Sequence, residues 1–160
     1  MRAIEPLILL YKGKSLTSRL IKWQSRGEYS HAAILFGDKV YESREFSGVR
    51  CRDIEAIDAA ADCYVLSEHG VYLLPGGQSE RWLQEQCGKK YDYAMVLDFV
   101  LRRRKQESRR SSNKWFCSEL AFMFFDEKLG IKLLNTDACM VSPHLLSLSP
   151  LIKKIRNPIH

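Results

Sequence analysis

The sequence lacks the paired cysteines that a disulfide framework or a zinc site requires. Its five cysteines are odd in number, widely spaced and free of any Cys-x-x-Cys pair. It also lacks long apolar runs, since Leu7 to Tyr11 is too short for a membrane span or the core of a signal peptide. We therefore expect mostly buried, reduced cysteines, a strand at Leu7 to Tyr11, and a cytoplasmic protein.

Internal repeats are absent as well, and the 160 residues are 46% hydrophobic, so we expect a single globular domain over residues 1–160. The net charge of +6 is concentrated in residues 102–110, which hold six basic residues and one acid. No aromatic residue interrupts this run to stack on bases, so we expect no obligate nucleic-acid partner. Two interpretations stay open: a solvated loop insertion at about 102–114, or contact with an anionic membrane surface or another polyanion. The basic residues concerned are Arg102, Arg103, Arg104, Lys105, Arg109 and Arg110.

Four segments have helical patterns. Ser15 can cap a helix with Leu16, Leu20 and Trp23 on one face, and Ser79 opens a second helix that Gly88 ends. Asp92 can cap a third, the most clearly amphipathic, whose apolar positions are Tyr93, Val96, Leu97, Val100 and Leu101. From Cys117 to Gly130 the sequence is apolar almost all round, which predicts a buried helix.

Residues 29–43 predict a β-hairpin around a Gly37-Asp38 turn. A two-residue turn pairs Ala33 with Glu42 and puts both on the face that His31 shares. Glu42 is then the diagonal neighbour of His31 and can orient its imidazole. A three-residue turn would move Glu42 to the opposite face.

Cys117 has two interpretations. A cysteine in the first turn of a helix lies near the positive end of the helix dipole and near unpaired amides, which favour a thiolate and can hold an oxyanion. A buried packing cysteine is the alternative. As a nucleophile it needs a histidine. His31 opens an apolar strand, whereas the rival, His144, follows a Ser142-Pro143 turn that predicts a short helix.

Several short motifs follow one another in a defined order. Ser30-His31 opens a strand, Val40-Tyr41-Glu42-Ser43 follows, and then come Gly88 to Asp92 (GKKYD) and Phe116 to Leu120 (FCSEL). Over roughly residues 5–125 this resembles the permuted papain-like cysteine hydrolases of the YiiX type, which are relatives of the NlpC amidases and the lecithin:retinol acyltransferases.

The resemblance implies a permuted papain-like α+β fold, in which an antiparallel sheet or small barrel packs against helices and the nucleophile begins a buried helix. It implies a hydrolase or acyltransferase acting on an amide or ester of a peptide, an acyl amide or a lipid, without metal or organic cofactor. Cys117 would be the nucleophile, His31 the general base and acid, and Glu42 the orienting group. We expect substrate contacts from Tyr91, Ser30 and Ser118. The alternative function is a non-catalytic module that binds lipid or a polyanion in the same cleft.

Overall fold

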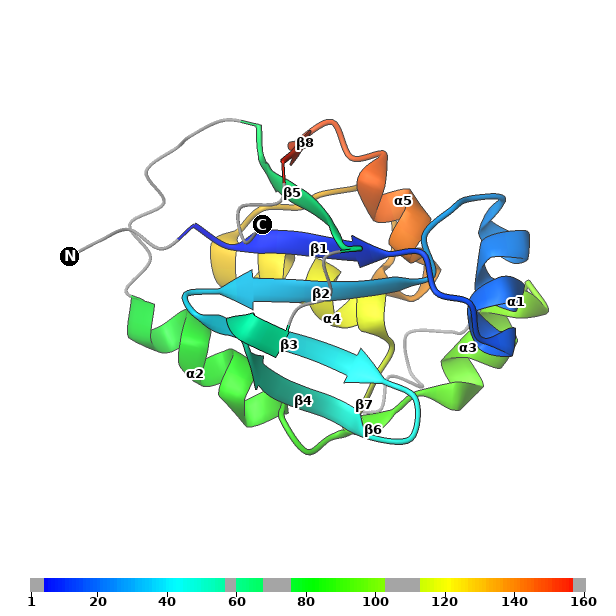
Figure 1. Cartoon of the computed structure of the whole chain (residues 1–160), viewed down its shortest axis with the longest axis horizontal. Helices are drawn as coiled ribbons and strands as arrows, with labels where there is room; N and C mark the ends of the chain where they lie inside the picture. The colour runs from blue at the N-terminus through cyan, green and yellow to red at the C-terminus, as the bar shows by residue number, and fades with distance from the viewer. Residues whose placement is uncertain (1–4, 57–59, 68–75, 103–112, 157–160) are drawn as a thin grey trace.

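The computed structural model describes residues 5–56, 60–67, 76–102 and 113–156, and it has an α+β architecture. A six-stranded antiparallel sheet forms one layer (Figure 1). Its strands, in spatial order, are β4 (Gly48–Asp53), β3 (Lys39–Arg44), β2 (His31–Phe36), β1 (Leu7–Tyr11), β5 (Asp62–Leu66) and β8 (Ile152–Ile155). The strand predicted at Leu7 to Tyr11 is confirmed as β1, between β2 and β5.

The β2–β3 hairpin has the predicted register. Gly37 adopts a φ of 66°, which glycine reaches without the steric cost of a side chain, and the two-residue turn pairs Phe36 with Lys39 and Ala33 with Glu42. Because side chains alternate between the faces of a sheet, this register puts Glu42 on the same face as His31.

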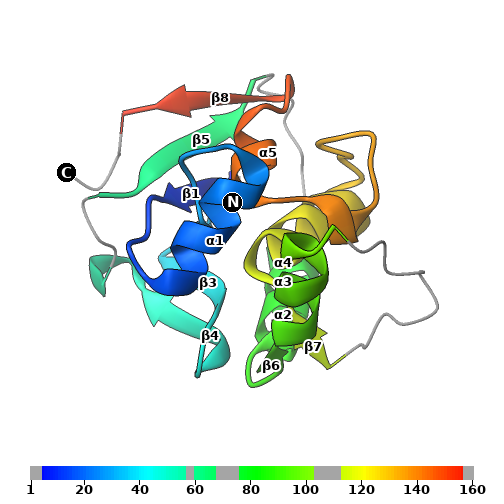
Figure 2. The same ribbon diagram turned by 90° about the vertical axis from the view of Figure 1, so that its right-hand side faces the viewer.

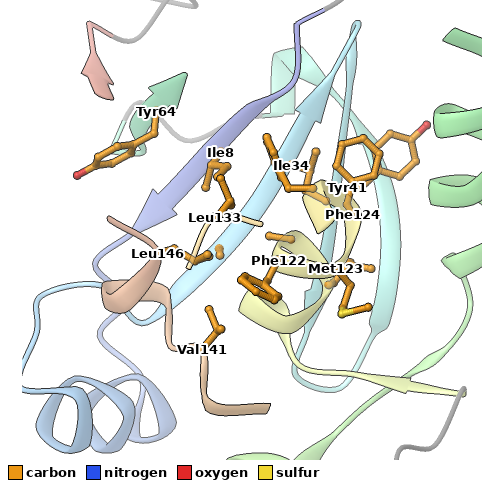
Figure 3. Close-up of a cluster of buried hydrophobic side chains, with 14 of the residues drawn as sticks. Ile8, Ile34, Tyr41, Tyr64, Phe122, Met123, Phe124, Leu133, Val141 and Leu146 are labelled. Carbon is orange, nitrogen blue, oxygen red and sulfur yellow. The ribbon is translucent and has the colours of Figure 1, made fainter. Parts of the chain in front are cut away.

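The long apolar segment from Cys117 forms the centre of the second layer. Helix α4 (Cys117–Met123) is buried at all seven positions and continues as a π-helical turn, η3 (Phe124–Lys128). It packs against β2 and β3, where Phe122 and Phe124 join Ile34 and Tyr41 in the main core (Figure 3). The predicted buried helix is therefore confirmed, and Gly130, with a φ of 66°, follows its end.

The remaining helices are α1 (Leu16–Ser25), α2 (Gly76–Gln86), α3 (Tyr93–Val100) and α5 (Pro143–Ser147). Single 3-10 turns, η1 (Ile54–Ala56) and η4 (Ala138–Met140), and a short parallel pair, β6 (Lys90–Tyr91) and β7 (Lys114–Trp115), complete the described elements. The predicted caps are confirmed, because Ser15 Oγ accepts the Ser18 N–H at 3.1 Å and Asp92 Oδ1 accepts the Met95 N–H at 2.9 Å. Helix α2 begins three residues before the expected Ser79.

The apolar faces predicted for α1 and α3 are largely exposed, and this corrects the expectation that such faces mark the buried side. Helix α1 buries Ile21, and α3 buries Met95 and Val96. These three side chains pack with Tyr91, Phe116 and Cys117 in a small cluster of their own. Leu16, Leu20 and Trp23 of α1, and Tyr93, Leu97 and Leu101 of α3 and its end, face outward.

The expectation of mostly buried cysteines was incomplete. Cys51 is exposed, while Cys63 and Cys117 are buried and the other two cysteines are partly buried. The C-terminal segment, which has a weak pattern, forms the edge strand β8. The basic positions 103–110 lie outside the described residues. Within the described ranges, no helix combines the length and the apolarity needed to cross a bilayer.

Candidate active site

His31 and Glu42 form a direct pair on the sheet. His31 is the first residue of β2 and Glu42 lies in β3. His31 Nε2 is 2.7 Å from Glu42 Oε2. The prediction that Glu42 is the diagonal neighbour of His31 is therefore confirmed. This placement depends on the two-residue turn at Gly37-Asp38.

Two arginines of β4 fix the other oxygen of Glu42. Arg50 Nη2 and Arg52 Nε each lie 2.9 Å from Oε1. Burial of this carboxylate, which is 1% exposed, would raise its pKa, but the His31 bond and the two guanidinium groups lower the pKa to about 2. Glu42 is therefore ionised at neutral pH, and both of its carboxylate oxygens have partners.

Sequence reasoning missed both arginines. The alternation Val49-Arg50-Cys51-Arg52 follows a Ser47-Gly48 turn, and this pattern could have indicated a third strand with two cations on one face. Such a strand is the natural partner for a buried carboxylate in its neighbour.

Cys117 approaches His31 from the helical layer. It is the first residue of α4, 2% exposed, and its side chain lies close enough to His31 to raise the pKa of the imidazole. Burial of the imidazole lowers its pKa, but the bonds to Cys117 and Glu42 outweigh burial and raise the pKa to about 9. His31 thus lies between a sulfur and a carboxylate and favours its protonated form at neutral pH.

A pocket of about 590 Å³ opens beside His31. Its walls include Lys14 and Ile21 from the α1 region, His31 from β2, Phe46 from the β3–β4 turn, and Tyr91 from β6. The Cys117 sulfur does not line this pocket. It lies in the buried cluster that contains Ile21 and Tyr91, two of the residues that do.

The three predicted substrate-contacting residues differ in position. Tyr91 lines the pocket and is 7% exposed, and burial, with the neighbouring Cys117 adding to it, raises the pKa of its hydroxyl. Ser30 also lines the pocket, and its hydroxyl accepts the Gly13 N–H at 2.9 Å. Ser118 is fully buried and donates to the Val141 carbonyl at 2.6 Å. Its geometry is that of a structural residue, and it is not among the residues that line the pocket.

The rival base His144 is used in packing. It lies in α5, and its ring fills the space that a side chain at Gly27 would occupy. The ring is 6.2 Å from that of Tyr29 between centroids. Glu119 accepts the Phe116 N–H in the first turn of α4, at 3.5 Å, which is the structural role expected of an acid at that position. His69 and His160 lie outside the described residues.

The described residues do not include a group of three or more His, Cys, Asp and Glu side chains that could hold a metal ion. The His31 and Glu42 atoms that such a site would need are already engaged with each other, with Cys117 and with the two arginines.

No family model matches the chain, and no curated protein matches its sequence. Among solved structures, the crystal structure of the metalloprotein YiiX from Escherichia coli O157:H7 is similar. It has a TM-score of 0.70, 15% sequence identity and coverage of 97% of both chains. At this identity the likeness establishes architecture alone: the chain has the α+β fold of YiiX, with an antiparallel sheet packed against helices.

Proposed function

We propose that the protein is a cysteine-dependent hydrolase or acyltransferase that acts on an amide or ester bond. Cys117 is the nucleophile, His31 the general acid and base, and Glu42 the orienting group. The observation that supports this most is the continuous chain of contacts from the Cys117 side chain through His31 to Glu42, which ends in Arg50 and Arg52. This is the arrangement of nucleophile, base and orienting acid that covalent catalysis requires.

The order of these residues along the chain also supports the proposal. The histidine strand precedes the cysteine helix, as expected from the resemblance to permuted papain-like hydrolases, and YiiX shares the fold. The fold carries no information on the reaction. YiiX is described as a metalloprotein, whereas the described residues of this chain do not include a group of three or more His, Cys, Asp and Glu side chains that could hold a metal ion. The proposed steps therefore use the side chains that are present.

In the first half-reaction, the Cys117 thiolate attacks the substrate carbonyl while His31 holds the proton. Backbone amides at the start of α4 stabilise the oxyanion. His31 then gives its proton to the leaving amine or alkoxide, so that the carbon–nitrogen or carbon–oxygen bond breaks and a thioester remains.

In the second half-reaction, water or an acceptor hydroxyl or amine attacks the thioester, and His31 takes its proton. The acid or the transferred acyl product leaves, and the proton returns to the Cys117–His31 pair. Glu42 keeps the imidazole oriented throughout. The protonated Tyr91 hydroxyl is a donor on the pocket wall, where it can contact the substrate.

The competing function is a non-catalytic module that binds lipid or a polyanion in the same pocket. The burial of Cys117, which is 2% exposed and does not line the pocket, favours this alternative. The hydrolase requires Cys117 to react faster than the other cysteines, whereas the binding module predicts that Cys117 reacts slowly.

The deciding experiment is alkylation with iodoacetamide at about pH 6, followed by mass mapping of all five cysteines. Exposure alone predicts that Cys51, the exposed cysteine, reacts first. The proposed function predicts instead that Cys117 reacts first, that His31→Ala removes this preference, and that Cys117→Ala abolishes hydrolysis of a small soluble ester. Preferential labelling of Cys51, with unchanged ester hydrolysis in Cys117→Ala, would overturn the proposal.

A further inference from the structure

Seven large apolar side chains are exposed around one end of the molecule. They come from α1, from the β3–β4 turn, and from α3 and its C-terminal end, and we call this set the apolar rim. Its members are Leu16, Leu20, Trp23, Phe46, Tyr93, Leu97 and Leu101. Helices α1 and α3 pack against each other and lie at the same end of the molecule, facing the viewer in Figure 2. The rim is therefore a local feature of this end.

Helix α1 divides its surface between the pocket and the solvent. Thr17, Ser18 and Ile21 line the pocket. Leu16 and Trp23, 73% and 70% exposed, lie with Leu20 on a face at positions i, i+4 and i+7. Exposing such side chains to water is unfavourable by about 25 cal/mol for each Å² of apolar surface. The helix thus presents an apolar stripe directly beside the pocket mouth.

Phe46 extends the rim across the pocket. It is 96% exposed and has a φ of 66°, a conformation that is strained for a bulky residue. The Tyr93 hydroxyl accepts its N–H at 2.8 Å, and the two rings are 6.4 Å apart between centroids. The chain therefore holds an aromatic ring in solvent at the pocket wall, at a cost that folding alone does not explain.

The charges near the rim indicate its partner. Residues 12–26 contain five basic residues and no acid. Lys12 is paired with Glu28 at 2.6 Å, which leaves Lys14, Arg19, Lys22 and Arg26 as the basic residues of this segment that concern the rim. A short helix with leucine and tryptophan on one face and basic residues along its borders has the composition of helices that lie in the interface of an anionic membrane. The cores of protein-binding surfaces are instead depleted in lysine.

We propose that the apolar rim docks on an anionic lipid bilayer and that the thiol site acts on an ester or amide carbonyl of a lipid in that bilayer. The second part rests on the proposed function. The apolar side chains enter the boundary between headgroups and acyl chains, where lipid carbonyls are located, and the basic side chains reach the headgroups. Docking through the exposed stripe of α1 and through Phe46 places the mouth of the pocket, which α1 and Phe46 border, beside the bilayer surface.

The test for docking uses the full chain with Cys117→Ala, so that binding is measured without turnover. Sedimentation compares vesicles of phosphatidylcholine with vesicles that contain about one third phosphatidylglycerol, at about 0.1 M salt. We expect binding to the anionic vesicles, reduced at least about tenfold by Leu16→Ser, Leu20→Ser and Trp23→Ser together. Leu151→Ser is the matched control, because Leu151 and Leu20 are both 41% exposed and Leu151 lies before β8, outside the rim.

Thermal unfolding of the triple variant verifies that it is folded. Absence of wild-type binding to anionic vesicles, or equal binding by the folded triple variant, overturns the docking proposal. Light scattering that shows a dimer of the wild type and a monomer of the triple variant also overturns it, because the rim would then bind a second copy.

The lipid substrate is tested separately. The wild-type chain is expected to release a fatty acid from the anionic vesicles that it binds, because the acyl chains of both lipids are held by ester bonds. A chain that binds these vesicles and hydrolyses only a soluble ester overturns the lipid substrate. A chain that binds but hydrolyses neither overturns the proposed function and leaves docking intact.

Discussion

The two walls of the pocket differ in how their side chains are satisfied. The sheet wall, formed by β2, β3 and β4, contains Glu42, which is 1% exposed and has partners on both carboxylate oxygens. The helix wall is formed by α1 and the segment before it, and the same helix leaves Leu16 and Trp23 more than two-thirds exposed. The buried carboxylate of the sheet wall is paired within the chain, whereas α1 exposes large apolar side chains to water. This difference fits the two proposals, which require chemistry at the first wall and recognition at the second.

The largest effect that tests this contrast is the loss of the base in the sheet wall. We expect His31→Ala to lower the rate of hydrolysis of a small soluble ester by about 100- to 10,000-fold, because proton transfer to and from the reacting groups is lost. Steady-state kinetics at saturating substrate measures it. His144→Ala is the control, since it removes the same group from a packing position beside Tyr29. Equal losses of rate in the two variants would contradict the proposed role of His31 as the base.

Glu42→Gln should give the next largest effect, on folding. The amide cannot balance Arg50 and Arg52, whose side chains are 34% and 25% exposed, so the substitution leaves partly buried charges without their partner. It should lower the free energy of unfolding by about 3 kcal/mol, the lower end of the range for a broken buried pair. Asp53→Asn is the matched control on the same sheet. Asp53 is 71% exposed and paired with Lys39, so its loss should cost at most about 1 kcal/mol. Urea denaturation measures both, and similar costs would contradict the distinction.

Within the helix wall, two neighbouring residues should behave oppositely. Ile21 is buried beside Tyr91 and Met95, so Ile21→Ala should destabilise the fold by about 2 to 4 kcal/mol. Leu20 is half-exposed, and Leu20→Ala should change stability by less than about 0.5 kcal/mol. Thermal and urea unfolding measure the pair. A large cost for Leu20→Ala would mean that its face is part of the folded core and not a free surface.

In the sheet wall, the pairing of β2 with β3 could be predicted from the sequence, because a local turn determines it. The Gly37-Asp38 turn and the alternation of residues 31–36 and 39–44 fix the register, and the register brings Glu42 to His31. Arg50 and Arg52 were not anticipated, because a strand with exposed and charged positions has a weak hydrophobic pattern.

The helix wall was predictable only in part for a different physical reason. Periodicity identifies an apolar face on α1, but it does not say whether that face packs in the core or is an exposed surface that contacts a membrane or a partner. Packing decided the question, since Ile21, outside the predicted stripe, enters the cluster with Cys117. Whether a helix-start cysteine lines a pocket or lies beneath its wall likewise depends on long-range packing.

A smaller effect than those expected for His31→Ala, Glu42→Gln and Ile21→Ala is a dependence of stability on pH that originates in the sheet wall. In the folded state the pKa of His31 is raised from 6.5 to about 9, because the bonds to Cys117 and Glu42 outweigh burial. The folded state therefore binds this proton more tightly than the unfolded chain does. The resulting stabilisation is fully present below pH 6.5 and is lost as the pH rises through 9.

We expect the free energy of unfolding to fall by about 2 kcal/mol between pH 7 and pH 9, as measured by urea denaturation at several pH values. His31→Gln should remove most of this slope, whereas Leu20→Ala, in the helix wall, should keep it. Glu42 adds nothing in this window, because its pKa is lowered to about 2 and it stays ionised throughout. If His31→Gln has the same slope as the wild type, another group titrates in this window. That result would contradict the proposed interaction of His31 with Cys117.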